Sequence, residues 1–422
     1  MSQDIHWKNY EGRFRTFPTR IEEEISVAPG LIICIPALAE PDVISTLQSL
    51  AACTLPNQAV EIIILFNKNK SMTGEDLMIH EASILSVDAW IKENQSLPFQ
   101  IFPLHIEEFP DNKGGVGWAR KYAMDEAARR LQQNGVIVCL DADCTVAENY
   151  LVEIEQAFLR NPEMDAASVY FEHIIPKLNA DEVSITEYEL HLRYLVHAQR
   201  WSGHPFAFYT VGSSMALRRR GYLAQGGMNT RSAGEDFYLL QKFIETNSFF
   251  EITSTTVFPS SRISHRVPFG TGRAMQYMSG GQDLHWMTTN FEIFKEIRPL
   301  FTALELFWKK INDSDPELIL ADAGIICSLS ERVLSFLKAT HFPEAIREIT
   351  RHTSGYPSFR KRFYRYFNAF HMIRYMHYMR DHFYPDVEVQ MATTDLFESM
   401  NLTPCGTARE SLEVLRRLDK GF

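Results

Sequence analysis

The chain lacks several features that would assign it to a protein class at once. Its six cysteines include no pair with Cys-x-x-Cys spacing, so reduced thiols in the core are the favoured interpretation. No apolar run approaches the ~18 residues of a membrane span, and the N-terminus has no apolar core of the kind that a signal peptide needs. Internal repeats and low-complexity tracts are missing too. We therefore expect a cytoplasmic globular protein.

The chain also has fewer basic than acidic residues. The chain has 42 Lys and Arg against 53 Asp and Glu, a formal net charge of -11. Proteins that neutralise nucleic-acid phosphates need a basic surface, so this balance argues against a general nucleic-acid binder and leaves only a local basic patch open. The 422 residues, 45% of them hydrophobic, exceed one typical domain and predict a large α/β domain plus a substantial additional part.

Short apolar runs alternate with helical patterns from Leu31 to about Ile175, which is typical of a layered α/β sheet. The predicted strands cover residues 31–38, 60–67, 99–106, 136–140 and 166–175, and the predicted helices between them include 43–52, 75–93 and 150–158. We expect a helix from Asp181, an irregular segment over 201–220 and a helix after 234–236. Helical patterns then dominate as far as Leu418.

Two aspartates, Asp141 and Asp143, come directly after the buried run Val136–Leu140. Ligands of open α/β sheets collect at the carboxyl ends of the strands, and alternate residues there can face one crevice. Paired carboxylates suit a hard cation such as Mg²⁺ or Mn²⁺. The structural alternative is that both acids cap the following helix.

Further along the chain come "GSSMALRRRGYLAQGGM" (212–228), "GED" (234–236) and "SHRVPFGTG" (264–272). In this order, after the Asp-x-Asp segment, they resemble the family-2 glycosyltransferases with the GT-A fold. The resemblance covers roughly residues 30 to 270. It implies an α/β, GT-A type layered, mostly parallel sheet flanked by helices in residues 30–272, with an N-terminal extension (1–29) and a mainly α-helical C-terminal region (273–422).

The resemblance also implies roles for the acidic residues. Asp143 is similar to the ligand of a divalent metal, Mn or Mg, and His265 is a candidate further ligand. Asp236 is similar to the general base that takes the proton of the acceptor hydroxyl, while Glu235 orients the site. The structural alternative for this acidic pair is a helix start, where carboxylates complement the helix dipole.

A third set of residues is similar to the family's nucleotide-sugar contacts. The resemblance implies that these are Pro36, Ala37, Glu40, Asn67, Lys113, Arg120, Asp141 and Ala142. Arg120 and Lys113 supply the positive charges expected nearest the phosphates. The chain departs from the family pattern at Ala39, where Asn is usual, and at Asn67, where an acid is expected.

These features predict a metal-dependent, inverting glycosyltransferase that moves one sugar from a UDP- or GDP-linked donor to an acceptor hydroxyl on a glycan or small molecule. Two alternatives are a sugar-nucleotide nucleotidyltransferase and a catalytically silent binding protein of the same fold. A nucleotidyltransferase would need a Gly- and Lys/Arg-rich loop near the first strand, and residues 35–42 do not provide one.

The segment 359–383 combines six Lys or Arg residues with many aromatic residues. As one helix it would carry an apolar stripe beside a basic surface. We expect the stripe to pack on the protein while the arginines face water. Peripheral contact with an anionic membrane is the alternative that is left open but not favoured.

Overall fold

The computed structural model describes residues 4–15, 17–25, 27–68, 72, 74–106, 115–176, 180–231, 234–262, 271–280, 285–311 and 315–421. The chain forms two compact units. The sheet unit comprises residues 1–175 and 209–276, and the helical unit comprises 176–208 and 277–422. This confirms the α/β class with a helical C-terminal region. The predicted functional borders at residues 29 and 272 stay predictions.

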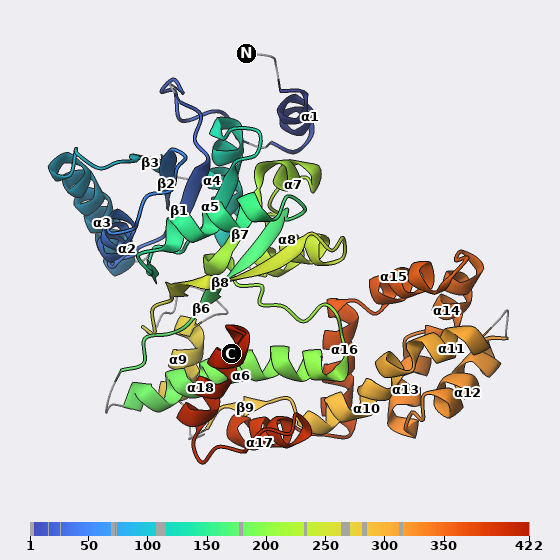
Figure 1. The fold of residues 1–422 in the computed structure, drawn as a ribbon. Coiled ribbons are helices and arrows are strands. Elements are labelled where there is room, and N and C mark those ends of the chain that lie inside the picture. The colour runs from blue at the N-terminus through green and yellow to red at the C-terminus, as the bar shows by residue number, and fades with distance from the viewer. Residues whose placement is uncertain are drawn as a thin grey trace. The chain divides into compact units, whose positions relative to one another are not determined.

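The sheet unit is built on one large, mostly parallel sheet of the order β3-β2-β1-β4-β7-β6-β8-β5 (Figure 1). Its strands are β3 (Gln100–Ile106), β2 (Val60–Asn67), β1 (Leu31–Ala37), β4 (Val136–Cys139), β7 (Met215–Arg218), β6 (Ala166–Phe171), β8 (Phe249–Phe258) and β5 (Thr145–Val146). The first four strands in this order are mutually parallel, as are β6 and β8, whereas β7 runs antiparallel to both its neighbours.

All five strands predicted from apolar runs are present. The prediction of an irregular segment over 201–220 was wrong in part, because β7 and the helix α7 (Arg219–Ala224) lie within or start in it. The strand β8 was not predicted at all. Its sequence, FFEITSTTVF, mixes buried, half-buried and exposed positions and is rich in Thr, so it lacks the continuous apolar run that marks β1 and β2.

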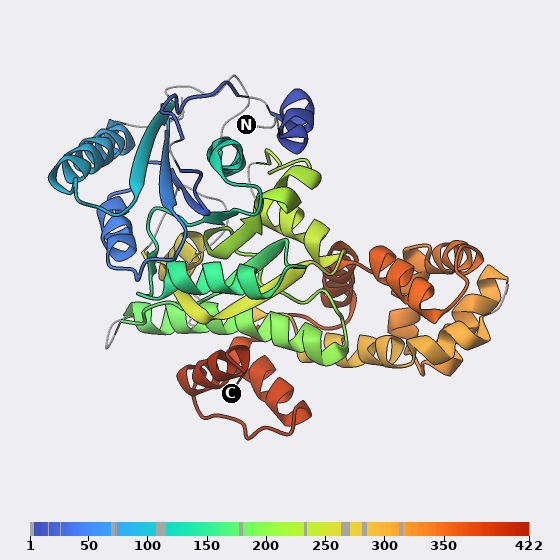
Figure 2. The same cartoon turned by 45° about the horizontal axis from the view of Figure 1, so that its top comes forward.

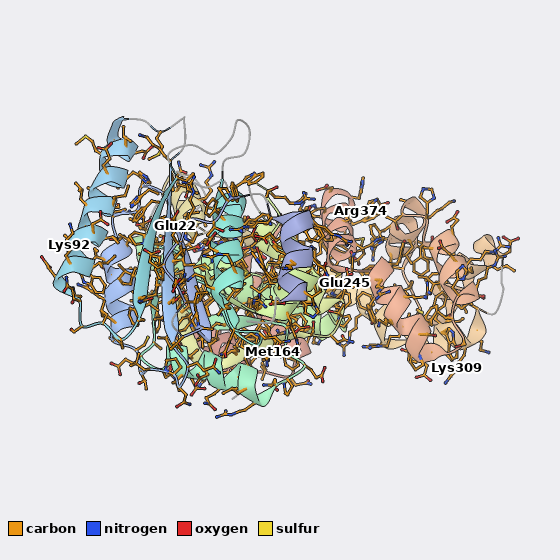
Figure 3. The ribbon with its side chains drawn as sticks, turned by 90° about the horizontal axis from the view of Figure 1, so that it is seen from above. Glu22, Lys92, Met164, Glu245, Lys309 and Arg374 are labelled. Carbon is orange, nitrogen blue, oxygen red and sulfur yellow. The ribbon has the colours of Figure 1, made fainter. Side chains whose placement is uncertain are left out.

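Helices cover both faces of the parallel strands (Figures 1 and 2). The helices α2 (Val43–Ala51) and α3 (Gly74–Glu93) lie on one face, and α4 (Val116–Arg130) lies on the other. Lys92, near the end of α3, is exposed on the side away from the sheet (Figure 3). Since β1 and β2 are covered on both sides, nearly all their residues are buried.

The N-terminal segment packs on α4 as part of the sheet unit. The helix α1 (Ile5–Phe14) places the hydroxyl of Tyr10 2.6 Å from Oδ1 of Asp125 on α4, and the hydroxyl of Tyr222 on α7 donates to the same oxygen at 2.5 Å. Lys121 donates to Tyr10 Oη at 2.9 Å. This buried network joins α1, α4 and α7.

The helical unit confirms the helical patterns of the C-terminal region. Its helices are α6 (Ala180–Ser202), α10 (Phe291–Thr302), α11 (Leu304–Lys310), α12 (Pro316–Ile326), α13 (Glu331–Ala339), α14 (Phe342–Arg351), α15 (Tyr356–Tyr366), α16 (Ala369–His382), α17 (Val389–Ser399) and α18 (Ala408–Asp419). A short antiparallel pair, β9 (Met287–Thr288) with β10 (Val387–Glu388), lies among them. The helix α9 (Thr271–Gly280) spans the border between the two units.

The segment 359–383 forms two helices, α15 and α16, so the expectation of one helix was wrong. The chain leaves the helical conformation at Phe367, and the side chain of Asn368 caps α16 by accepting a hydrogen bond from the backbone N–H of His371 at 3.1 Å. The expected packing of the aromatic stripe is confirmed, because Phe359, Phe363 and Phe367 are all fully buried.

All six cysteines are free thiols, and five of them are buried, as expected. Among the residues that the structure describes, no helix is both long enough and apolar enough to cross a membrane.

Candidate functional site at the strand ends

The carboxyl ends of β1, β2 and β4 meet at one edge of the sheet, because these strands are parallel and in register. Ala37 ends β1 and Asn67 ends β2, and both side chains are buried. Beyond β4 the chain turns through Asp141, Ala142 and Asp143. Ala142 is held in this turn by its carbonyl oxygen, which accepts a hydrogen bond from the Thr46 hydroxyl at 2.8 Å. The two aspartates are partly exposed at this edge.

Arg120 joins the turn after β4 to the start of the helix α8 (Glu235–Ile244). Its Nη2 donates to Oδ1 of Asp141 at 2.6 Å, and its Nη1 forms an ion pair with Oε1 of Glu235. Both Arg120 and Glu235 are almost fully buried, whereas the Asp141 side chain is 37% exposed. Residues far apart in the sequence are thus brought together at the strand ends.

Gly212 makes room for this arrangement. A Cβ atom at position 212 would lie 2.4 Å from Nη1 of Arg120, so a larger residue would displace the guanidinium. Gly212 begins the 3₁₀ turn Gly212–Ser214 that leads into β7. The segment 212–214 therefore lines the arginine and completes the site from a third part of the chain.

The electrostatics of the cluster follow from burial and from Arg120. Burial raises the pKa of Glu235, and the Arg120 guanidinium opposes that rise without cancelling it. Burial likewise raises the pKa of Asp236 against the opposing effect of Arg120. Burial alone would lower the pKa of Arg120, but the carboxylates of Asp141 and Glu235 outweigh it and raise that pKa. Arg120 thus stays charged and holds the acids together.

Asp236 differs from its neighbour Glu235 in solvent exposure. Glu235 is only 2% exposed, while the Asp236 side chain is partly exposed. Oδ1 of Asp236 accepts the backbone N–H of Phe237 at 2.7 Å, and a backbone hydrogen bond from Gly212 also stabilises its charged form. Of the two acids at the start of α8, Asp236 is therefore the one that can reach a bound molecule.

A divalent metal at Asp143 stays a prediction. Mg²⁺ is usually held by one or two carboxylates together with substrate phosphates, so a site of this kind needs no cage of protein ligands. Among the described residues, no group of three His, Cys, Asp or Glu side chains could hold a metal by itself. The Asp141 carboxylate is engaged by Arg120, and Oδ1 of Asp143 accepts a hydrogen bond from the Cys144 thiol at 3.7 Å.

Glu40 makes structural contacts that were not predicted from the sequence. Its carboxylate accepts hydrogen bonds from Nη2 of Arg262 at 2.6 Å and from the backbone N–H of Asp42 at 3.1 Å. Ala39, which precedes it, adopts a left-handed conformation with φ of 47°, and its backbone N–H donates to Nδ1 of His80 at 3.3 Å. The loop after β1 is thus fixed by Arg262 and His80. Pro36, the partly exposed residue of β1, lies just before this loop.

Several sequence-based expectations have a definite outcome here. Asp141 and Asp143 do not cap the next helix, α5 (Tyr150–Arg160), because its N-cap residue is Asn149. The guanidinium of Arg120 contacts carboxylates at the strand ends, and its expected place near the phosphates stays a prediction. Lys113 and His265 lie outside the described residues, so their proposed contacts with phosphate and metal stay predictions.

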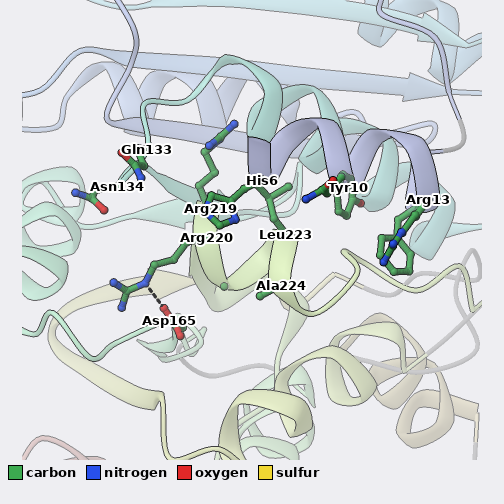
Figure 4. Close-up of a pocket in the computed structure, with 13 residues that line it drawn as sticks. His6, Tyr10, Arg13, Gln133, Asn134, Asp165, Arg219, Arg220, Leu223 and Ala224 are labelled. Atoms are coloured by element: carbon green, nitrogen blue, oxygen red, sulfur yellow. Dashed lines mark hydrogen bonds and ion pairs between the residues drawn. The ribbon is translucent and has the colours of Figure 1, made fainter. Parts of the chain in front are cut away.

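A cavity of about 550 Å³ lies at the opposite edge of the sheet, between α1 and α7 (Figure 4). Its lining includes Arg219 and Arg220, which form ion pairs with Asp4 and Asp165 respectively. Residues 133–134, which precede β4, also line it. It contains none of the candidate site residues and is therefore separate from the site at the strand ends.

Comparison with known proteins gives limited information. No protein-family model and no curated protein matches the chain. Similar solved structures include that of S. aureus TarS residues 1–349, with 12% identity over 81% of this chain and 91% of that one and a TM-score of 0.38. The complex of TarS with UDP-GlcNAc has 11% identity over the same shares and a TM-score of 0.40. The complex with UDP has 13% identity over 77% of this chain and 92% of that one, with a TM-score of 0.38. At this level of similarity, function has to be argued from the chain's own residues.

Proposed function

We propose that the protein transfers a sugar from a nucleoside-diphosphate sugar to an acceptor hydroxyl. One observation carries the proposal: Arg120 holds the Asp-x-Asp turn and the Gly-Glu-Asp helix start together at the carboxyl ends of parallel strands. The turn offers a carboxylate for a metal-bound diphosphate, and the helix start offers a base. Both suit a metal-assisted glycosyl transfer, and both lie at the strand ends where α/β sheets bind nucleotides.

Asp236 is the residue that we assign as general base. As the acceptor oxygen forms its bond to the anomeric carbon, the bond from that carbon to the diphosphate oxygen breaks, and Asp236 takes the hydroxyl proton. Its raised pKa suits this role, since a base with a pKa nearer the working pH accepts a proton more readily. Attack from the side opposite the leaving diphosphate would invert the anomeric configuration.

Asp143 is the residue that we assign to a divalent metal, Mn²⁺ or Mg²⁺. Such an ion, when bound, stabilises the negative charge that develops on the leaving diphosphate. We assign Asp141, which Arg120 holds and which is 37% exposed, to a contact with the nucleoside. Glu235, which is buried, keeps Arg120 in position.

The proposal is tested by a thermal-shift screen against UDP-, GDP-, dTDP- and CDP-linked sugars and the matching nucleoside triphosphates, each with and without Mn²⁺. A ligand that binds only the folded protein raises its melting temperature, so the donor can be found without knowing the acceptor. We expect one nucleotide class to stabilise the protein, and to do so more strongly with Mn²⁺. Stabilisation by nucleoside triphosphates alone would point instead to a nucleotidyltransferase.

A further inference from the structure

The stretch from Ile349 to Arg380 has no acidic residue, although the whole chain has a net charge of -11. It carries seven Lys or Arg and three His residues. Most of it folds into α15 and α16 of the helical unit. An acidic protein thus concentrates positive charge on two consecutive helices.

The helix α15 separates its aromatic and basic residues onto opposite faces. Phe359 and Phe363 are fully buried, and Tyr364 is 5% exposed. Lys361, Arg362 and Arg365 are exposed and project from the other side, as the helical period requires. We call these three residues the basic face. Arg351 on α14, Arg360 on α15 and Arg374 on α16 (Figure 3) are further exposed cations of the same stretch.

The charges of the basic face and of the three further cations are not neutralised within the described part of the chain. Lys361, Arg362, Arg365, Arg351 and Arg374 form no ion pair there, and Arg360 lies over the ring of Tyr364 at 5.2 Å. Of the helices packed against α15, α14 carries Glu344 and Glu348, and α11 carries Glu305, which pairs with Lys309 at 2.8 Å. Basic residues outnumber these acids.

We propose that the basic face docks on an anionic lipid bilayer. Charge complementarity carries the inference, because the exposed Lys361, Arg362 and Arg365 lie on one side of α15 without an ion pair and match a negatively charged surface. Proteins that bind single-stranded nucleic acid usually do so in a groove with exposed aromatic rings. The rings of Phe359 and Phe363 are buried, which favours a membrane over such a strand. The same burial means that these rings cannot insert into the lipid, so the contact is peripheral and electrostatic.

The strength of the contact follows from the number of cations. Each Lys or Arg close to an anionic membrane strengthens binding about fivefold. Removing three of them should therefore weaken binding roughly 100-fold. Salt screens such contacts over a Debye length of about 10 Å at 0.1 M, so binding should also fall steeply with ionic strength. This inference does not depend on the proposed sugar transfer.

The test is co-sedimentation of the full-length protein with vesicles of phosphatidylcholine alone or with 30 mol% phosphatidylglycerol, at low and high NaCl. We expect binding only to the anionic vesicles, and loss of binding at high salt. The variant Lys361→Glu/Arg362→Glu/Arg365→Glu should not bind the anionic vesicles at either NaCl concentration. The control Arg160→Glu/Lys338→Glu/Arg417→Glu makes the same charge change at exposed, unpaired cations of other helices and should bind nearly as well as the parent.

Three results would overturn the proposal. The first is that the protein does not bind anionic vesicles. Binding of soluble polyphosphate through the same residues, without vesicle binding, would also count as this result. The second is equal binding by the two charge-reversal variants at matched melting temperature. The third is binding to neutral vesicles that is lost in Leu318→Ser/Ile325→Ser, which would make the exposed apolar side chains of α12 the membrane contact instead.

Discussion

Arg120 and Glu235 form a buried ion pair across 115 residues of sequence, and the same guanidinium reaches Asp141 at 2.6 Å. This contact connects the strand end that carries Asp143 to the helix that carries Asp236. The geometry of the candidate site therefore depends on one arginine.

Replacing Arg120 with Met should destabilise the protein by about 3–5 kcal/mol, since Glu235 would be left buried and unpaired. The double variant Arg120→Met/Glu235→Gln should recover most of that loss, because removing both charges avoids the uncompensated one. Urea denaturation followed by tryptophan fluorescence measures both. Equal stability of the single and double variants would show that the pair does not hold the fold.

The metal assignment predicts that Asp143→Ala abolishes the Mn²⁺-dependent part of nucleotide binding without unfolding the protein, because the carboxylate is partly exposed. Titration calorimetry with the nucleotide found in the screen measures this effect. The matched control is Asp165→Ala, which removes a carboxylate that pairs with Arg220 on the surface, away from the strand-end site. Unchanged Mn²⁺-dependent affinity in Asp143→Ala would remove Asp143 from the site.

The N-terminal segment should be required for the stability of the sheet unit. A Cβ atom at Gly227 would lie 2.0 Å from the Tyr10 hydroxyl, and Gly227 has a φ of 75° that side chains disfavour. We expect Gly227→Ala to cost about 1–3 kcal/mol by strain and by displacing Tyr10 from Asp125. Gly12→Ala, in α1 with open space around it, should instead stabilise by roughly 0.5–1 kcal/mol. Thermal melts of the two variants that shift in the same direction would contradict this account.

The helical unit should lose stability in mild acid. Burial lowers the pKa of His204 and that of His371 to about 4, from 6.5 in the unfolded chain. His204 bonds through Nε2 to the carbonyl of Phe367, and its buried Nδ1 has no partner for an added proton. Because the folded pKa is the lower one, this stability is complete above pH 6.5 and falls as the pH drops toward 4.

The loss at pH 4 is about 3 kcal/mol for each such histidine. Urea denaturation at a series of pH values between 7 and 4 measures it. The variant His204→Gln, which keeps a donor for the Phe367 carbonyl, should show a shallower decline than the parent. A parallel decline in the two proteins would exclude His204 as a source of the pH dependence.

Much of the sheet and the place of the site were predictable from sequence. The runs 31–37, 60–67 and 136–139 are apolar because helices cover both faces of these strands, and Asp141 and Asp143 follow the last of them directly. These strands, and the acids that follow the last of them, can therefore be recognised from the local sequence alone.

The rest depends on tertiary contacts that no local pattern encodes. The pairing of Arg120 with Glu235 arises from the packing of α4, α8 and the turn at Gly212. Arg262 was not predicted to bind Glu40, because nothing in its own segment indicates a partner 222 residues away. The strand β8 was missed because polar Ser, Thr and Glu residues interrupt its apolar sequence.

The central claim, sugar transfer with Asp236 as base, is tested most directly by the rate at which nucleoside diphosphate is released from the identified donor. We predict that Asp236→Asn, a nearly isosteric change, keeps donor affinity but slows release by a factor on the order of 10² to 10⁴. The raised pKa of Asp236 predicts that the parental rate falls as the pH drops through it, and that this acid limb is absent in the variant. Release at the parental rate by Asp236→Asn, with an unchanged pH profile, would contradict the account.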